Sequence, residues 1–169
     1  NDSRNGMYFK ATASGYIYPY QEYKHGVAER GYVWRTAELY LNRAEAYMEK
    51  YKAGTAECGQ LAVNDLNKLR ENRFTNYSNY TLSTTDDLEN LCKLERRREL
   101  FMEGHRWFDL RRYGMPRIEH TWVSENGQRT TYVLQEKDPG YTLPISQDVL
   151  DRNSKLVQNE LATDRIGTN

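Results

Sequence analysis

The sequence predicts a mainly α-helical protein that combines a helical hairpin, a third long helix, a small β-hairpin and long loops. Apolar residues recur at helical spacing over residues 35–52 and 60–72. Residues 94–114 place many charges among apolar residues that keep the same spacing. Asn126-Gly127 lies between β-rich flanks, which is a strong hairpin signal. We expect one domain over residues 1–169, because that length suits a single domain. A chain of this length buries roughly 70% of its unfolded surface, so it can form a core.

Composition excludes several classes of protein. The chain has 24 basic and 24 acidic residues, so no net charge steers it toward nucleic acid or an anionic membrane. The arginine run 96–98 is flanked by Glu95 and Glu99, which offset it. No apolar run approaches the roughly 18 residues that span a bilayer, so we expect a soluble chain. Cys58 and Cys92 are too few for a disulfide framework, and a single bridge between them stays open.

The first 32 residues contain glycines and aromatic residues without a sustained period, and they predict a loop segment with a short strand. Tyrosine covers a surface while keeping a polar tip, so this segment favours an interface or a surface that faces sugars. The aromatic residues of the segment are Tyr8, Phe9, Tyr16, Tyr18, Tyr20, Tyr23 and Tyr32.

The helical hairpin is predicted over residues 35–72. Gly54 ends its first helix, and its second helix, residues 60–72, directs Ala62 and Leu66 inward. Small residues at the contact resemble one tetratricopeptide-type unit, although the connection is longer than in that repeat. One such unit cannot bury both of its faces. Either the third helix closes the bundle, or a longer protein supplies the missing surface.

The third helix and its continuation are predicted over residues 84–114. Ser83 and Asp86 match a capping box that would start the helix just before Leu88. Gly104 is unfavourable inside a helix, so it predicts a kink or a close approach of another backbone. Pro116 ends the helical region.

The charges of residues 94–114 stand where a buried stripe is expected. An isolated buried charge is too costly to keep, so we expect the acidic residues of this stretch to pair with its own arginines in a structural charged lock. We expect Arg98→Ala or Asp109→Ala to destabilise the fold by several kcal/mol, because breaking a buried pair costs roughly 3–5 kcal/mol. The residues of the charged lock are Glu95, Arg98, Glu99, His105, Arg106, Asp109 and Arg111.

Two chemical alternatives for this stretch are weaker. Glu95 and Glu99 share a helix face as an acid and a base would, but the surrounding arginines would lower their pKa values and remove the general acid. His105 and Asp109 lie at i,i+4 without a third metal ligand. We therefore expect no catalytic residue, no metal and no cofactor. Trp34, Trp107 and Phe108 are interpreted as core residues.

The β-hairpin is predicted over residues 121–134, with Trp122 and Tyr132 close together. A flat aromatic face beside polar donors suits a sugar ring, so these two residues are the candidate ligand contacts. The alternative is that this flank packs on the helices. Residues 141–169 are expected to form an extended tail in which Ser146 caps a short helix through Leu150.

Three blocks of the sequence together resemble the carboxy-terminal part of the SusD/RagB family. The blocks are RTAELYLNRAEAYMEKYKAG with AVNDLNKLR, ERRRELFMEGHRWFDLRRYG and YTLPISQDVLDRNSKLVQN. Their order and spacing match over residues 30–160. The chain departs from the family pattern at Ser146, where a second proline is common, and at Glu160-Leu161, where Pro-Gly-Tyr usually follows.

The resemblance implies a mostly helical surface lipoprotein of Bacteroidetes, located at the outer membrane. It would bind an oligosaccharide or another nutrient and cover a SusC-like TonB-dependent transporter, without catalysis. Membrane contact would pass through a lipid anchor that this chain lacks, so we expect a carboxy-terminal part of a longer protein. Ligand contacts of the family lie mostly outside the matching part, so none is transferred. The alternatives are a tetratricopeptide-like scaffold that binds only protein, and a glycosidase.

Overall fold

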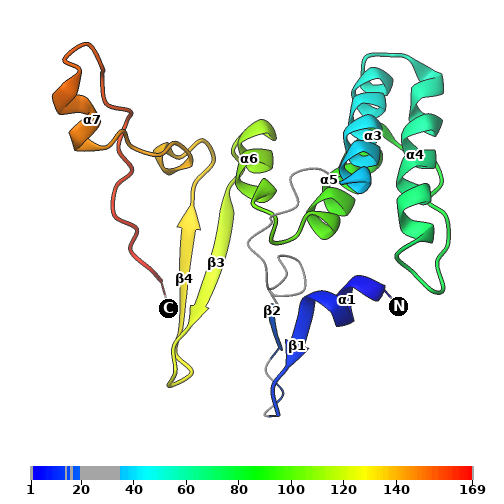
Figure 1. Ribbon diagram of the computed structural model, residues 1–169, viewed down its shortest axis with the longest axis horizontal. Helices are drawn as coiled ribbons and strands as arrows, with labels where there is room; N and C mark the ends of the chain where they lie inside the picture. The colour runs from blue at the N-terminus through cyan, green and yellow to red at the C-terminus, as the bar shows by residue number, and fades with distance from the viewer. Residues whose placement is uncertain (1, 14, 16, 20–34, 169) are drawn as a thin grey trace. The chain divides into compact units, whose positions relative to one another are not determined.

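The computed structural model describes residues 2–13, 15, 17–19 and 35–168. The chain divides into two compact units, Asn1–Arg106 and Trp107–Asn169, and each is described by itself. The elements are labelled in Figure 1. Within the described residues, no helix is both long and apolar enough to cross a membrane.

Three helices form the core of the first unit. They are α3 (Thr36–Lys52), α4 (Ala56–Glu71) and α5 (Thr85–Glu99), which lie side by side in Figure 1. The predicted helical hairpin is present, although α4 begins at Ala56 rather than at residue 60, so the prediction of a long connection is wrong. Helix α5 packs on both helices of the hairpin and closes the bundle. The buried core residues are Ala37, Leu41, Ala44, Met48, Ala62, Val63, Leu66, Leu69, Leu88, Cys92 and Leu100.

The small residues predicted at the contact of the hairpin are fully enclosed there. Ala44 of α3 and Ala62 of α4 are both 0% exposed, which allows the two helices to approach closely. Cys58 and Cys92 are buried and unbridged. Burial raises the pKa of the Cys92 thiol to about 12, with the charges of nearby glutamates adding to the effect.

The helix boundaries around α5 differ from the prediction in two places. The N-cap is Thr84 rather than Ser83, and its hydroxyl accepts a hydrogen bond from the Asp87 amide. The predicted kink is a full break between α5 and α6 (His105–Arg112). Gly104 has a φ of 79° there, and a Cβ would meet nothing within 4 Å. Glycine is therefore favoured at this position by the left-handed backbone conformation. The predicted close approach of another backbone is wrong.

The amino-terminal segment contains a helix that the sequence pattern did not predict. This helix, α1 (Ser3–Tyr8), precedes an antiparallel pair of short strands, β1 (Phe9–Ala11) and β2 (Ile17–Pro19). The Asp2 side chain caps α1 by accepting from the Arg4 amide. Such a short helix has no detectable periodicity, so its signal lay in the cap alone. Tyr16, Tyr20, Tyr23, Tyr32 and Trp34 lie outside the described residues.

The second unit contains the predicted hairpin, formed by antiparallel strands β3 (Ile118–Val123) and β4 (Arg129–Leu134). Its turn is longer than a two-residue Asn-Gly turn. The Ser124 amide donates to the Gln128 carbonyl, the Gly127 amide donates to the Ser124 carbonyl, and Gly127 has a φ of 83°. This pattern is a type I turn followed by a left-handed glycine, which explains why Gly127 is needed.

The carboxy-terminal segment is held by side chains that form hydrogen bonds with backbone amide and carbonyl groups. Gln158 accepts from the Ile145 amide at 2.8 Å and donates to the Ile145 carbonyl at 2.8 Å, while Asn159 donates to the Leu143 carbonyl. Helix α7 (Gln147–Arg152) lies between Ile145 and Gln158 in the sequence, after the 3-10 helix η1 (Pro139–Tyr141). Ser146 is at the N-cap of α7 but makes no side-chain capping bond, which corrects the predicted cap.

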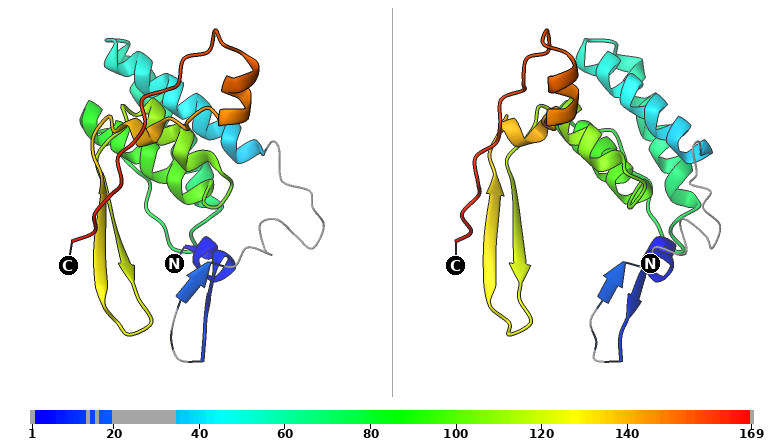
Figure 2. Two further views of the ribbon diagram at one scale, coloured as in Figure 1. Left: turned by 90° about the vertical axis from the view of Figure 1, so that its left-hand side faces the viewer. Right: turned by 60° about the vertical axis from the view of Figure 1, so that its left-hand side comes forward.

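The end of the tail returns to the hairpin. Thr168 exchanges two backbone hydrogen bonds with Thr131 of β4, at 2.8 and 3.0 Å. Figure 2 shows this segment running along the outer edge of β4. The tail therefore covers one of the two edges that a two-stranded hairpin exposes.

Candidate functional site

Glu99 is a fully buried carboxylate of the charged stretch, 0% exposed, and it accepts hydrogen bonds from described arginines of three different segments. Arg73 donates through Nε at 2.9 Å and Nη2 at 2.8 Å, Arg35 through Nη1 at 3.0 Å, and Arg4 through Nη1 at 3.1 Å. The carboxylate is thus removed from water only because charged donors surround it.

Glu95 lies one turn earlier on the same face of α5 and is also 0% exposed. Its Oε1 accepts from Arg98 at 2.9 Å, Arg70 at 3.0 Å and the Tyr80 hydroxyl at 3.0 Å. Its Oε2 lies 3.4 Å from Arg4 Nη2. The Arg4 guanidinium therefore bridges both glutamates, which joins α1 to α5.

The cations of this network come from elements far apart in the sequence. Arg4 belongs to α1, Arg35 is the N-cap residue of α3, Arg70 lies in the last turn of α4 and Arg73 follows it. The prediction that Glu95 and Glu99 pair with arginines of their own stretch is therefore wrong, except for Arg98. We call these residues the arginine–glutamate network: Arg4, Arg35, Arg70, Arg73, Glu95, Arg98 and Glu99.

The helix pattern explains why only Arg98 joins from within the stretch. Glu95 and Glu99 follow Leu88 and Cys92 along the buried stripe of α5, so they point into the bundle, where the ends of α3 and α4 meet them. Arg98 lies on the rim, with its side chain 41% exposed. Sequence periodicity places the glutamates in the core. It does not indicate which arginines from distant parts of the sequence bind them.

The network is suited to holding structure rather than to proton transfer. Burial alone would raise the pKa of Glu99, but hydrogen bonds and charges from Arg73 and Arg35 outweigh it and lower the pKa to about 2. A general acid needs the opposite, a pKa raised toward the working pH. Glu99 is therefore an anion at neutral pH, and it ties α5 to the segments that carry Arg4, Arg35 and Arg73.

The remaining members of the predicted charged lock lie outside this network. His105 Nδ1 lies 4.0 Å from Glu38 Oε1, and Arg106 and Arg111 are exposed. Asp109 is 4% exposed and accepts from Arg112 at 3.0 Å, in the second unit. The structure thus brings together Glu95, Arg98 and Glu99 from the predicted set.

Two aromatic residues of α6 were predicted to be core residues, and that prediction is wrong. Phe108 is 65% exposed and Trp107 is 36% exposed. Trp107 nevertheless stacks on buried Tyr141, with ring centroids 4.9 Å apart. No three His, Cys, Asp or Glu side chains gather in the described part of the chain in a way that would hold a metal ion.

The two candidate ligand contacts lie on one face of the hairpin. Trp122 pairs with Thr130 and Tyr132 with His120, so the two aromatic residues are diagonal neighbours. Trp122 is 53% exposed and Tyr132 is 40% exposed. A Cβ at Gly167 would lie 3.0 Å from the Tyr132 ring, so the tail already contacts that ring. Trp122 is the more open of the two.

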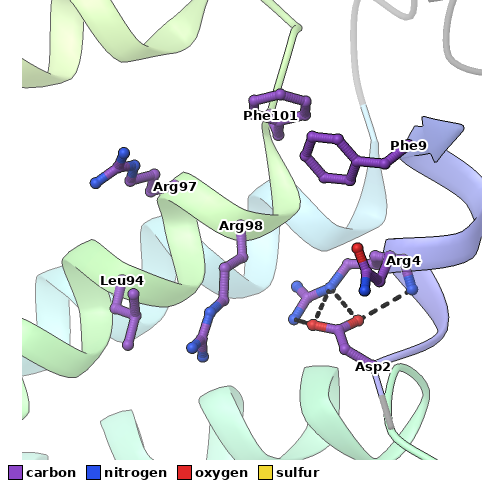
Figure 3. Close-up of a pocket in the computed structure, with 8 residues that line it drawn as sticks. Asp2, Arg4, Phe9, Leu94, Arg97, Arg98 and Phe101 are labelled. Atoms are coloured by element: carbon purple, nitrogen blue, oxygen red, sulfur yellow. Dashed lines mark hydrogen bonds and ion pairs between the residues drawn. The ribbon is translucent and has the colours of Figure 1, made fainter. Parts of the chain in front are cut away.

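Sequence reasoning did not find a pocket between α1, β1 and the outer face of α5. Its volume is about 430 Å³, within the about 300–1,000 Å³ that is usual for ligand sites. Figure 3 shows Phe9 beside Phe101, and their ring centroids are 5.1 Å apart. The pocket is lined by Asp2, Arg4, Asn5, Phe9, Leu94, Arg97, Arg98 and Phe101.

The described residues form a mainly helical protein with a buried arginine–glutamate network. Residues 1–161 match the model of the SusD family, so the chain belongs to that family. It is also similar to a SusD-like protein of Bacteroides fragilis whose crystal structure is known, at 25% identity and a TM-score of 0.48. That similarity covers 73% of this chain and 24% of the other, so the chain spans about a quarter of that protein's length. No curated protein matches the chain.

Proposed function

We propose that this protein is a nutrient-binding component of an outer-membrane uptake system, acting with a SusC-like TonB-dependent transporter. Membership of the SusD family over residues 1–161 is the observation that carries the proposal. The protein would be anchored by lipid at the cell surface and would present an oligosaccharide to the transporter. Glu99 is ionised at neutral pH, so it does not serve as the general acid of the glycosidase alternative.

In this proposal the three-helix core is scaffold and the hairpin carries a ligand contact. Trp122 offers a half-exposed indole on a two-stranded ribbon, and Thr130 stands opposite it with a hydroxyl. Indole faces pack well on the apolar face of a pyranose, and neighbouring polar groups set its orientation. Tyr132 would contact the same sugar from the diagonal position, with the part of its ring that the segment around Gly167 does not cover.

Isothermal titration calorimetry with a panel of neutral oligosaccharides tests this function. We expect at least one to bind, and Trp122→Ala to weaken that binding by roughly tenfold, as loss of a stacking contact of 1–1.5 kcal/mol would. Val157→Ala is the control, because Val157 is an apolar side chain that is 85% exposed in the tail. Failure of every glycan and peptide to bind would remove the nutrient-binding proposal.

A scaffold that binds only protein is the second candidate. Leu39 of α3 and Leu61 of α4 are 64% and 40% exposed, so the helical hairpin has apolar side chains outside the core. Purification of the protein with a soluble partner and without a membrane barrel would favour that candidate.

A further inference from the structure

The pocket beside α5 uses a helix face that the core leaves unused. Leu94, Arg97 and Arg98 lie on α5 at i, i+3 and i+4, and Phe101 follows the end of that helix at Glu99. This segment therefore lines the pocket with two guanidinium groups and two apolar side chains.

The charges of the described residues leave this surface positive. Asp2 is neutralised by Arg4, whose Nε and Nη2 donate to its two oxygens at 2.7 to 3.1 Å. Arg98 donates to Glu95, an anion that it shares with Arg70 and Arg4. Of the described residues that line the pocket, Arg4, Arg97 and Arg98 are basic and Asp2 is acidic.

Arg97 is the arginine of this pocket that makes no ion pair within the described part of the chain, and its side chain is exposed. Guanidinium stays charged at any physiological pH, and its planar fork matches a carboxylate in a bidentate geometry. Phe9 and Phe101 add a tilted aromatic pair to the lining of the same pocket, at an interplanar angle of 33°.

We propose that this pocket binds an acidic sugar, a hexuronate unit of an oligosaccharide. Its carboxylate would be held by Arg97 with support from Arg98, and its ring would pack on Phe101, Phe9 and Leu94. The inference rests on the proposed nutrient-binding function and names a ligand class for it. The pocket residues belong to the first unit, whereas Trp122 of the proposed neutral-sugar contact belongs to the second.

The test is calorimetry of the full chain with tri-galacturonic acid, with maltotriose as the neutral probe and inorganic sulfate as the simple anion. We expect the acidic trisaccharide to bind, with a Kd that rises at least tenfold in Arg97→Gln and recovers in part in Arg97→Lys. Arg152→Gln, an exposed arginine of α7, is the matched control and is expected to stay within twofold of the unaltered protein. Circular dichroism verifies that each variant is folded.

Three outcomes would overturn the assignment. Equal affinity of Arg97→Gln and the unaltered protein would place the acidic sugar elsewhere. Sulfate binding as tightly as the trisaccharide would show an anion site without sugar recognition. Maltotriose binding without tri-galacturonic acid binding would remove the acidic-sugar site and leave the proposed function standing, whereas loss of the proposed function requires that no nutrient binds at all.

Discussion

Replacing Glu99 by glutamine is the sharpest perturbation of the fold. The substitution keeps the shape of the side chain and removes its charge. Arg4, Arg35 and Arg73 would then converge on a neutral amide, one end of which is itself a donor. The three guanidinium groups would lose their common anion within a bundle where Glu99 is 0% exposed.

Two separate estimates of the expected loss of stability agree. Removing one partner of a buried ion pair costs roughly 3–5 kcal/mol. The pKa of Glu99 falls from an ordinary 4.5 to about 2 in the folded protein, and a difference of that size corresponds to about 3 kcal/mol. Because the folded-state pKa is the lower one, this stability is complete above about pH 4.5. It is lost as the pH falls from there toward about 2.

Urea unfolding followed by circular dichroism at pH 7 and at pH 3 measures both effects. We expect Glu99→Gln to lower the free energy of unfolding by about 3 kcal/mol at pH 7, and by clearly less at pH 3. The control is Glu57→Gln, an exposed residue in the first turn of α4, for which a loss of at most about 1 kcal/mol is expected. A loss below about 0.5 kcal/mol for Glu99→Gln would refute the reasoning, since that is the effect of an ordinary surface site.

Three further predictions follow from burial and backbone conformation. Arg98→Ala should cost less than about 1 kcal/mol and Arg70→Ala roughly 3–5 kcal/mol in the same urea assay, because the Arg98 side chain is 41% exposed and that of Arg70 is 10% exposed. The loss of several kcal/mol expected from the sequence for Arg98→Ala is therefore too large. Gly127→Ala should lower the stability of the hairpin unit by roughly 1–2 kcal/mol, measured by tryptophan fluorescence, because its φ is 83°. Cys58 and Cys92 should resist a thiol reagent until urea unfolds the chain; a thiol pKa of about 12 leaves Cys92 roughly a thousandfold less thiolate than usual.

The elements with strong periodicity were predictable from sequence. The bounds of α3 differ by one residue from the predicted range, because its apolar stripe contacts both neighbouring helices and tertiary packing agrees with local pattern. The hairpin was predictable from Asn126-Gly127. The length of its loop was not, because an Asn-Gly pair occurs both in two-residue turns and in three-residue loops that end in a left-handed glycine.

The contents of the network were only half predictable. Burial of Glu95 and Glu99 follows from their place in the α5 stripe, so sequence reasoning placed the anions correctly. Their cations were not predictable, because Arg4 and Arg73 approach Glu99 from positions 95 and 26 residues away along the chain. Local spacing carries no information on such contacts. The same limit explains Phe108, whose helical spacing suggested core but whose side chain is 65% exposed.

We propose that this SusD family member works at the outer membrane with a transporter barrel. Affinity purification of the protein from detergent-solubilised outer membranes, followed by mass spectrometry, would detect that partner. We expect a TonB-dependent barrel protein to co-purify in near-stoichiometric amount. Recovery of the protein alone, or with soluble partners only, would contradict it.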